Sequence, residues 1–377
     1  EKVKNYKGSY IRNEKYYFKP GITWSRISRE KVSFRYISSG YIFNDAGPGI
    51  FDKEKNNYYN LSLLNSIVTN VMLKALNPTM TFQVGDIAKI PILYPENNKI
   101  FKRINSITKS NIKISKKDWN SFEISWNFKK HPLLTHKKNT YKVKDAFINW
   151  KQFTTNQFYQ LKENEEELNK IFIDIYGLED ELNPEVKEKK VTVRKADRAR
   201  DIRSFMSYAV GCMFGRYSLD EEGLVYAGGE FDLSRYKTFE ADEDNIIPVL
   251  DEEYFDDDIV SKFVEFVRVT FGEEYLEENL EYIADALIEG GTTRQDTARQ
   301  TIRRYFLFDF IKDHVSTYNK RPIYWLFQSD GRGKAFNALI YMHRYDKHTV
   351  ARVRTDYLHE LQSKIEAEKT RLKGIIY

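Results

Sequence analysis

The first part of this sequence is rich in side chains that bind nucleic acid. Arginine and lysine can pair with phosphates, and arginine, glutamine and hydroxyl groups can also hydrogen-bond to base edges. Here they stand among many aromatic residues. Taken singly, each is also an ordinary solvated loop residue, so the prediction rests on the set. The predicted contact residues are Lys19, Thr23, Trp24, Arg26, Arg29, Lys31, Arg35, Tyr36, Ser38, Asn44, Thr79, Thr81, Gln83, Arg103, Lys109, Lys113 and Lys116.

The charges of the chain are divided between its two parts. Residues 1–160 carry 28 Lys and Arg against 11 Asp and Glu, a balance of about +17, in a chain of 377 residues with a net charge of +5. The remainder carries 32 against 44, about −12. A basic, aromatic-rich part joined to an acidic part predicts nucleic-acid contact in the first part only. The acidic stretch 217–290 fits a solvated face, and also a surface that receives a basic partner.

Short strands and polar loops are expected to hold the first group of contact residues. The loops 23–31 and 44–49 contain the arginines, hydroxyls, glycines and proline that strands avoid. Ser38-Ser39-Gly40 supplies a hairpin turn. The predicted strands cover 15–19, 32–37 and 41–43.

Residues 61–92 organise this part of the chain. Apolar residues recur at spacings of three and four from Leu61 to Ala75, which predicts a helix. Asn77-Pro78 ends it, because proline lacks an N–H donor and disfavours a helical residue before it. A turn and then a strand over 87–92 are expected to follow. The periodicity alone fits an ordinary core helix and strand equally well.

Helices are expected to dominate the rest of the chain. Residues 97–120 alternate isoleucines and lysines at helical spacing, which predicts an amphipathic helix whose cationic face suits a phosphate backbone or simply solvent. Further predictions are a long helix over 141–182, helix N-caps at 256–258 and at Thr293-x-x-Asp296, a β-hairpin over 322–345 and a last helix over 356–372.

Other chemistries fit the sequence poorly. Ser329 to Lys334 lacks the first glycine and the final Ser or Thr of a phosphate loop, so a hairpin turn is the better interpretation. His343 and His348 lack zinc-ligand spacing, and the single Cys212 excludes a disulfide framework. The many acidic residues of 240–258 single out no nuclease set. No apolar run approaches the ~20 residues of a membrane span, so we expect a cytoplasmic protein without membrane contact.

Two sets of residues resemble known families. The order of parts in 61–92, a leucine-rich helix, a turn, Gly85-Asp86 and then Ile-Pro-Ile, resembles the target recognition domains of restriction-modification specificity subunits. DRARDIRSFMSYAVGCMFGRYSLDEEGLVYAGGE, which begins at Asp197, resembles the C-terminal region of the PglX-like adenine-specific DNA methyltransferases of BREX phage-defence systems. KRPIYWLFQSDGRGKAFNALIYMHRYDKHT, DNIIPVL and YFDDDIVSKFVEF also resemble this region, so the likeness covers nearly all of the chain.

The resemblance implies an α+β fold. We expect a small β-rich target recognition lobe with bracing helices, followed by a mostly helical C-terminal domain with a β-hairpin. The implied domains are a DNA target recognition domain over 1–150, a connecting helix and linker over 151–195, and the C-terminal domain over 196–377.

The resemblance also implies that the catalytic domain lies N-terminal to the matched region. In agreement, the sequence lacks the glycine-rich S-adenosylmethionine loop and the Asn-Pro-Pro-Tyr-like motif of adenine methyltransferases, since Asn77-Pro78 and Asn183-Pro184 are followed by other residues. We therefore expect no cofactor in this chain, and S-adenosylmethionine in the full-length enzyme. Glu1 is not an initiator residue, and a piece of a longer protein is expected.

The implied function is sequence-specific recognition of double-stranded DNA. Arg26, Arg29 and Arg35 are the candidates for bidentate bonds to guanine, and Gln83 for adenine. The expected partners are duplex DNA, the chain's own N-terminal methyltransferase domain and other BREX proteins. The alternative is an interaction module in which the acidic part docks other defence-system proteins and DNA contact is secondary.

Overall fold

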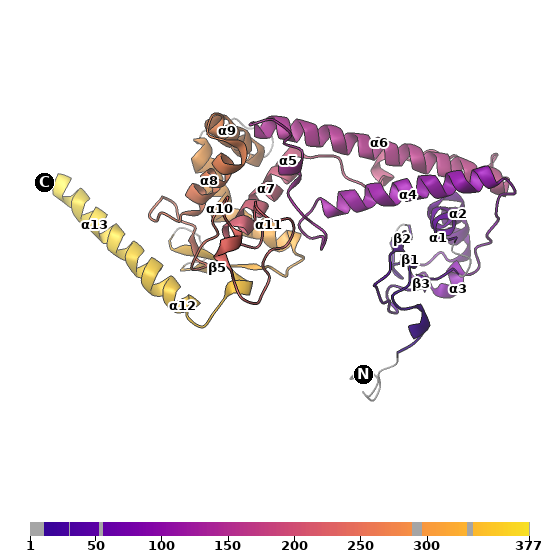
Figure 1. Cartoon of the computed structure of the whole chain (residues 1–377), viewed down its shortest axis with the longest axis horizontal. Helices are drawn as coiled ribbons and strands as arrows, with labels where there is room; N and C mark the ends of the chain where they lie inside the picture. The colour runs from indigo at the N-terminus through magenta and orange to yellow at the C-terminus, as the bar shows by residue number, and fades with distance from the viewer. Residues whose placement is uncertain (1–10, 30, 53–55, 289–295, 330–334, 377) are drawn as a thin grey trace. The chain divides into compact units, whose positions relative to one another are not determined.

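The computed structural model describes residues 11–376 except 30, 53–55, 289–295 and 330–334 (Figure 1). It divides into two compact units, of which the first comprises residues 1–117 and 156–194 and the second 118–155 and 195–377. The boundary predicted near 195 lies next to one of these divisions, and the boundary predicted at 150 lies five residues before the division between 155 and 156. Two long helices, α4 (Asn98–Asn120) and α6 (Val143–Tyr176), contribute residues to both units, which a division by sequence segments cannot represent.

A three-stranded antiparallel sheet forms the β part of the first unit. Its strands are β1 (Gly21–Trp24), β2 (Phe34–Ile37) and β3 (Gly49–Ile50), in the order β2-β1-β3. The predicted strand at 32–37 is confirmed as β2. The predicted strands at 15–19 and 41–43 are wrong, since Glu14–Tyr16 is a 3-10 turn and residues 41–43 have no regular secondary structure. Thr23 and Trp24, predicted in a loop, lie in β1.

Two helices replace the single helix predicted from Leu61 to Ala75. Ser66 separates α1 (Asn57–Asn65) from α2 (Ile67–Leu76), because its side chain accepts a hydrogen bond from the Thr69 N–H and thereby caps α2. The predicted end before Pro78 is confirmed.

The strand predicted over 87–92 is wrong. The chain instead forms the short helix α3 (Val84–Ile87), and the N–H of Gln83 donates to the carboxylate of Asp86. Pro91 follows without an N–H to offer to a neighbouring strand.

Long helices brace the first unit. Ile104 and Ile107 of α4 pack with Tyr59, Leu63 and Val68 of the α1 and α2 region and with Leu168 and Phe172 of α6. A second cluster places Ile22, Trp24 and Phe34 of the sheet against Leu61 and Leu64 of α1. The amphipathic helix predicted over 97–120 is confirmed, and a further 3-10 turn covers Glu188–Lys190.

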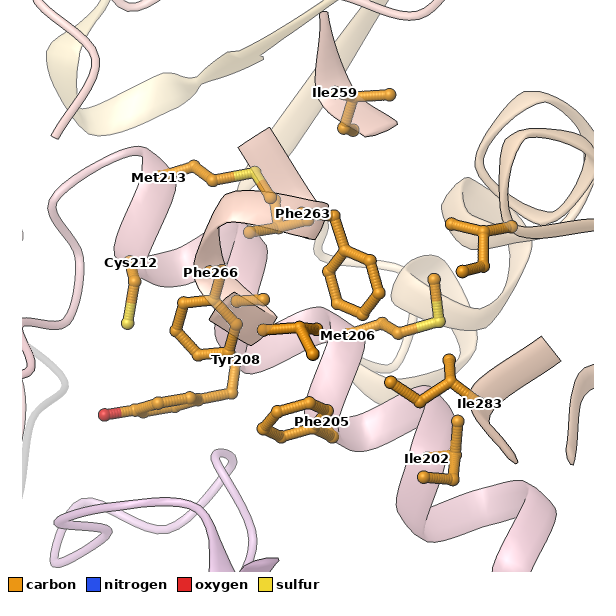
Figure 2. Close-up of a cluster of buried hydrophobic side chains, with 14 of the residues drawn as sticks. Ile202, Phe205, Met206, Tyr208, Cys212, Met213, Ile259, Phe263, Phe266 and Ile283 are labelled. Carbon is orange, nitrogen blue, oxygen red and sulfur yellow. The ribbon is translucent and has the colours of Figure 1, made fainter. Parts of the chain in front are cut away.

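The second unit is mostly helical, and its described residues form one large hydrophobic core and a second cluster of nine buried residues. On α7, Ile202, Phe205, Met206 and Ala209 recur at the spacing of one helix face, and all four are fully buried. Figure 2 shows the rings of Phe205, Phe263 and Phe266 gathered with Met206 and Ile283. The described helices are α5 (Pro132–Thr135), the first part of α6, α7 (Arg198–Met213), α8 (Ile259–Phe271), α9 (Leu276–Leu287), α10 (Ala298–Phe308), α11 (Phe310–Thr317), α12 (Thr349–Arg352), a π-helical turn (Val353–Leu358) and α13 (His359–Ile376), with 3-10 turns at Leu233–Arg235 and Met342–Arg344.

A second antiparallel sheet completes this unit. It has the order β4-β6-β5, with β4 (Ile247–Pro248), β5 (Tyr324–Gln328) and β6 (Asn337–Tyr341). The predicted hairpin is confirmed, although its turn lies partly outside the described residues. The predicted N-cap is also confirmed, since Asp258 accepts from the N–H groups of Val260 and Ser261. The predicted cap at Thr293 lies outside the described residues. Taken together, the fold is α+β, as predicted.

Candidate nucleic-acid interface

Three loops of the first unit meet on one surface, which we call the loop cluster: residues 25–29, 44–47 and 79–83. The first and third loops pair as a short antiparallel bridge between Ile27 and Thr81. Ser28 N–H donates to Met80 O at 2.9 Å, and Phe82 N–H to Arg26 O at 2.7 Å. The second loop joins through Arg26 N–H, which donates to Ala46 O at 3.1 Å. The structure therefore brings together three loops whose predicted contact residues are far apart in sequence.

A buried tryptophan anchors the loop cluster to the core. Trp24 is 1% exposed, and its indole N–H donates to Phe82 O at 3.1 Å. The predicted DNA contact by the Trp24 side chain is therefore wrong, because the ring fills the core under the loops. Thr23 has a similar role, since its hydroxyl donates to Pro48 O at 2.8 Å next to the second loop.

The three arginines predicted to read guanine belong to this surface, and they differ in how they are held. Arg26 forms an ion pair with Asp45 of the second loop. Arg35 of β2 lies opposite Thr23 in the strand register, and its guanidinium donates to the Ser25 hydroxyl at 3.3 Å. Arg29 is exposed at the end of the first loop. Arg26 is thus the most firmly positioned of the three.

Asparagine side chains shape two of the loops. Asn77 accepts from the Thr79 N–H at 2.9 Å and from the Thr79 hydroxyl at 2.6 Å, and its amide donates to Thr81 O at 2.8 Å. Asn44 accepts from the N–H groups of Ala46 and Gly47 at 3.0 Å. Gln83, the predicted adenine reader, is exposed at the N-terminal end of α3. The loops therefore have defined shapes before any ligand binds.

The cationic face of α4 forms a second surface, which we call the lysine stripe: Lys102, Lys109, Lys113 and Lys116. These exposed residues recur at spacings of seven, four and three, so they share one face of the helix. Lys109 lies 5.0 Å from the ring centre of Tyr58, and Lys116 lies 5.8 Å from that of Tyr36. The two rings stack at 5.4 Å.

Strand β2 links the two surfaces. Successive side chains of a strand point to opposite faces. Arg35 therefore joins the loop cluster, and Tyr36 on the other face joins the lysine stripe through Lys116 and Tyr58. Ser38, just after the strand, is half-buried, and Lys19, which precedes β1, is exposed.

Two predicted cations, both at exposed positions, already have partners within the first unit. Arg103 makes a bidentate ion pair with Glu167 at 2.7 Å, which raises the pKa of the guanidinium and lowers that of the carboxyl. The ammonium of Lys31 donates to Asn65 O at 3.0 Å. Its burial lowers the pKa of Lys31, and burial also raises the pKa of nearby Glu165 to about 7. DNA contact by Arg103 and Lys31 would compete with these internal partners.

Comparison with curated proteins gives two relatives along nearly the whole chain, while no protein-family profile matches it. "Adenine-specific methyltransferase PglX" of Lacticaseibacillus casei (strain Zhang) is 46% identical over 373 residues, which cover 97% of this chain and 30% of that protein. "Adenine-specific methyltransferase BrxX" of Escherichia coli O9:H4 (strain HS) is 39% identical over 389 residues, which cover 96% of this chain and 32% of that protein.

The chain belongs to this PglX and BrxX family of adenine-specific methyltransferases. It corresponds to a C-terminal part of them and spans less than a third of the length of these curated relatives. The family predicted from the sequence is thereby confirmed.

Sequence reasoning missed several residues of the loop cluster. Asp45 and Asn77 position Arg26 and Thr79, and neither was among the predicted contact residues. Ile27 and Met80, one in each of two loops, are large apolar residues that are 64% and 56% exposed. An isoleucine within the polar run 25–29 was the available signal for the first of them.

The second unit contains an acidic pocket of about 360 Å³, lined by residues 240–244, Asp257, Lys262 and Tyr357. The Tyr357 hydroxyl lies 2.9 Å from an Asp244 oxygen and 2.7 Å from an Asp257 oxygen. Since one hydroxyl has one proton, it cannot donate to both carboxylates at once. Burial and the neighbouring Asp242 raise the pKa of Asp244 to about 7, so a protonated Asp244 can supply the second hydrogen bond.

In the part of the chain that the structure describes, no group of three or more His, Cys, Asp or Glu residues is arranged to hold a metal ion. Within the same residues, no helix is both long and apolar enough to cross a membrane.

Proposed function

We propose that the first unit is a sequence-specific module that binds duplex DNA for an adenine-N6 DNA methyltransferase of a BREX phage-defence system. The observation that carries this proposal is the meeting of three loops, rich in arginine and hydroxyl groups, on one surface anchored to the core. Base readout needs such positioned side chains, because bidentate hydrogen bonds to base edges tolerate little displacement.

The two surfaces suit different parts of a duplex. The lysine stripe extends over fifteen residues of α4, about 21 Å at the rise of an α-helix, and offers ammonium groups to phosphates. Arg26, Arg29 and Arg35 can each bond a guanine edge, and Gln83 an adenine edge. Asp45 holds Arg26 in place until a base replaces it as the partner. Phosphate contacts then fix the register, and the loop cluster supplies the sequence preference.

The catalytic step belongs to the rest of the full-length protein in this proposal. The relatives are named adenine-specific methyltransferases, and this chain covers 30% and 32% of them. The remainder would bind S-adenosylmethionine and the extruded adenine, and the complete enzyme would mark host DNA in the cytoplasm. This chain alone should transfer no methyl group from labelled S-adenosylmethionine to DNA.

Selection from a pool of random duplexes tests the recognition proposal. The wild-type chain should enrich a short sequence that contains guanine. Arg26→Ala should relax the preference at one guanine position, and Gln83→Ala at one adenine position, without loss of the folded state. Lys144→Ala, an exposed cation of the second unit, is the matched control and should enrich the wild-type sequence. A wild-type chain that binds the pool but enriches nothing would contradict sequence recognition.

The acidic pocket favours a second candidate function, docking of another defence-system protein on the second unit. Its carboxylates would accept a lysine or arginine side chain of a basic partner. Co-purification from cells distinguishes the candidates. If docking is the main function, Glu240→Gln with Glu243→Gln should release a bound BREX protein, and charge removal in the loop cluster should leave assembly and defence intact.

A further inference from the structure

The last helix of the second unit packs against the core only at its beginning. Leu361 of α13 is 5% exposed and lies in one hydrophobic cluster with Phe255. Lys364 also reaches back to the unit, since its ammonium donates to Tyr254 O at 2.6 Å and lies 4.4 Å from the ring centre of Phe255. From residue 365 to 373 every side chain is exposed, and Figure 1 shows α13 extending beyond the other elements of this unit.

The base of α13 is fixed on the unit. The helix continues the π-helical turn Val353–Leu358, in which the Tyr357 hydroxyl lies 2.9 Å from an Asp244 oxygen and 2.7 Å from an Asp257 oxygen. π-Helical turns are rare and occur frequently at functional sites. With its base held in this way, the exposed part of α13 points in a defined direction before any partner binds, which lowers the entropic cost of binding.

The exposed part of α13 gains little stability from the unit. Ion pairs within the helix join Lys369 to Glu366 at 3.0 Å and Arg371 to Glu368 at 2.7 Å. Exposed pairs of this kind contribute little. Short helices without tertiary packing are marginal in water, because most helical stability in proteins comes from packing of an apolar face. A partner that covers such a face would therefore stabilise α13.

The apolar side chains of α13 share one face, which we call the α13 stripe: Leu361, Ile365 and Leu372. Their spacings of four and seven place all three within about 40° of arc around the helix axis. Leu361 is buried, whereas Ile365 and Leu372 are each 47% exposed. A stripe that belongs to the core at the base of the helix is thus uncovered further along. The spacing of seven is that of a coiled-coil seam.

The positions beside the α13 stripe are neutral or cationic. With Ile365 and Leu372 at position a of a heptad, the flanking e and g positions hold Gln362, Lys364, Lys369 and Arg371. Two copies of this helix, parallel or antiparallel, would bring these cations against one another, which is unfavourable. Duplex DNA would pair with the cations but leave the apolar side chains uncovered. A helix with an apolar stripe between acidic positions matches both features.

We propose that α13 is a docking helix that pairs with an amphipathic helix of a partner protein, whose apolar stripe is flanked by glutamate or aspartate. Ile365 and Leu372 would be buried in the seam between the two helices. Lys369 and Arg371 would then pair with carboxylates of the partner. Glu368, on the same face, would restrict the register at a cost in affinity, as a single polar residue in such a seam does.

This surface is separate from the two sites described above. The acidic pocket would receive a basic side chain, whereas the α13 stripe with its flanking cations requires an acidic partner. The docking helix also does not depend on DNA binding by the first unit, so either proposal can fail while the other stands.

Two designed peptides test the docking helix on the complete chain. Both have three heptads with isoleucine at a and leucine at d, and one carries glutamate and the other lysine at every e and g position. The glutamates keep the acidic peptide from pairing with itself. Anisotropy of a fluorescent label on each peptide measures binding. The acidic peptide should bind the wild-type chain at least about tenfold more tightly than the basic peptide, because like charges across an interface are costly.

Paired substitutions on the two faces of α13 identify the surface. Ile365→Gln, Leu372→Gln should weaken binding of the acidic peptide by about tenfold or more, because both side chains lose their burial in the seam. Glutamine is a good helix former, so the helix should be kept. Ser363→Gln, Thr370→Gln, which are also seven apart and lie exposed on the opposite face, is the matched control and should bind as the wild type does. Circular dichroism checks that each variant is folded.

Each other outcome would overturn the docking helix. A wild-type chain that binds neither peptide, or both equally, would do so, as would a folded Ile365→Gln, Leu372→Gln variant that keeps the wild-type affinity. Sedimentation of the complete chain tests for a second copy as the occupant. Self-association that the stripe variant loses would assign the stripe to that contact, and loss of duplex-DNA affinity in the folded stripe variant would assign α13 to DNA instead.

Discussion

The two units of this chain place their side chains in opposite ways. Among its described residues, the second unit buries 40 hydrophobic residues in one cluster rich in aromatic rings and nine more in a second, smaller cluster. The first unit has clusters of ten, eight and four buried residues and positions its loops by hydrogen bonds such as that from Trp24 to Phe82. In the first unit, hydrogen bonds hold short loops with exposed polar side chains in place, which suits recognition of a ligand. In the second unit, the large core contributes mainly to stability.

The two structural units differ less in net charge than residues 1–160 and 161–377 do. The first unit has 27 Lys and Arg against 18 Asp and Glu, about +9, and the second has 33 against 37, about −4. The acidic second part of α6 belongs to the first unit, where Glu167 pairs with Arg103 and Glu165 lies in the field of Lys31. These two carboxylates therefore offset the charge of nearby cations of the same unit. The loop cluster and the lysine stripe are cationic surfaces away from these two carboxylates.

The largest expected effect is loss of stability in the second unit. Phe205 is fully buried among Phe263, Phe266 and Phe271. Phe205→Ala should lower the free energy of unfolding by about 3–5 kcal/mol, because it removes apolar burial and leaves a cavity. Urea unfolding followed by circular dichroism measures this. A loss below about 1 kcal/mol would contradict one continuous, tightly packed core.

Removing one arginine of the loop cluster should weaken binding of the recognised sequence. Arg29→Ala should cost about 1–3 kcal/mol for that sequence and much less for unrelated duplexes, since a bidentate base contact discriminates between bases. Competition binding with matched and mismatched duplexes measures the difference. Equal losses for both would reassign Arg29 to phosphate contact.

Removing the lysine stripe should act on all duplexes alike. The Lys109→Ala, Lys113→Ala, Lys116→Ala variant should reduce the slope of log affinity against log salt by roughly one for each lysine that touches a phosphate. Sequence preference should be unchanged. An unchanged slope would show that the stripe is a solvated face, which the sequence also allowed.

The stability of the second unit should depend on pH through the protonation of Asp244. Its folded pKa of about 7 lies above the ordinary value of about 3.9, so protonation stabilises the fold. This contribution is complete below about pH 4 and is lost as the pH rises through about 7. Hydrogen exchange of residues 240–262 should therefore slow as the pH falls within that range, after correction for intrinsic exchange. Asp244→Asn should weaken the dependence and leave the part due to Asp257, whose pKa is also raised by burial, and Glu253→Gln, at an exposed position, should keep the full dependence.

The smallest expected effect concerns Trp126. It is fully exposed, in contrast to Trp24 at 1%. Trp126→Ala should change the free energy of unfolding by no more than about 0.5 kcal/mol. A larger loss in urea unfolding would mean that Trp126 packs against part of the protein.

Long periodic elements of this fold could be predicted from the sequence, and short ones could not. The amphipathic pattern of α4 repeats over 23 residues, so its cationic face followed from spacing alone. Four-residue elements such as α3 and β1 contain too few periods to separate helix, strand and loop. The burial of Trp24 depends on Phe82, 58 positions along the chain, and the ion pair of Arg26 on Asp45, 19 positions away. The residue types identified candidates for DNA contact. Only the tertiary contacts show which of them are buried and support the loops, and which are exposed and able to contact a base.

The central claim is that the first unit binds DNA through its loop cluster. Its most direct test is the affinity of the complete chain for duplex DNA over a range of salt concentrations, with two charge-matched variants. We expect Arg26→Ala, Arg29→Ala, Arg35→Ala to abolish sequence preference and reduce affinity strongly. Lys144→Ala, Lys237→Ala, Lys347→Ala, which removes three exposed cations of the second unit, should bind as the wild type does. Equal losses in both variants, or no salt-dependent binding by the wild-type chain, would contradict the account.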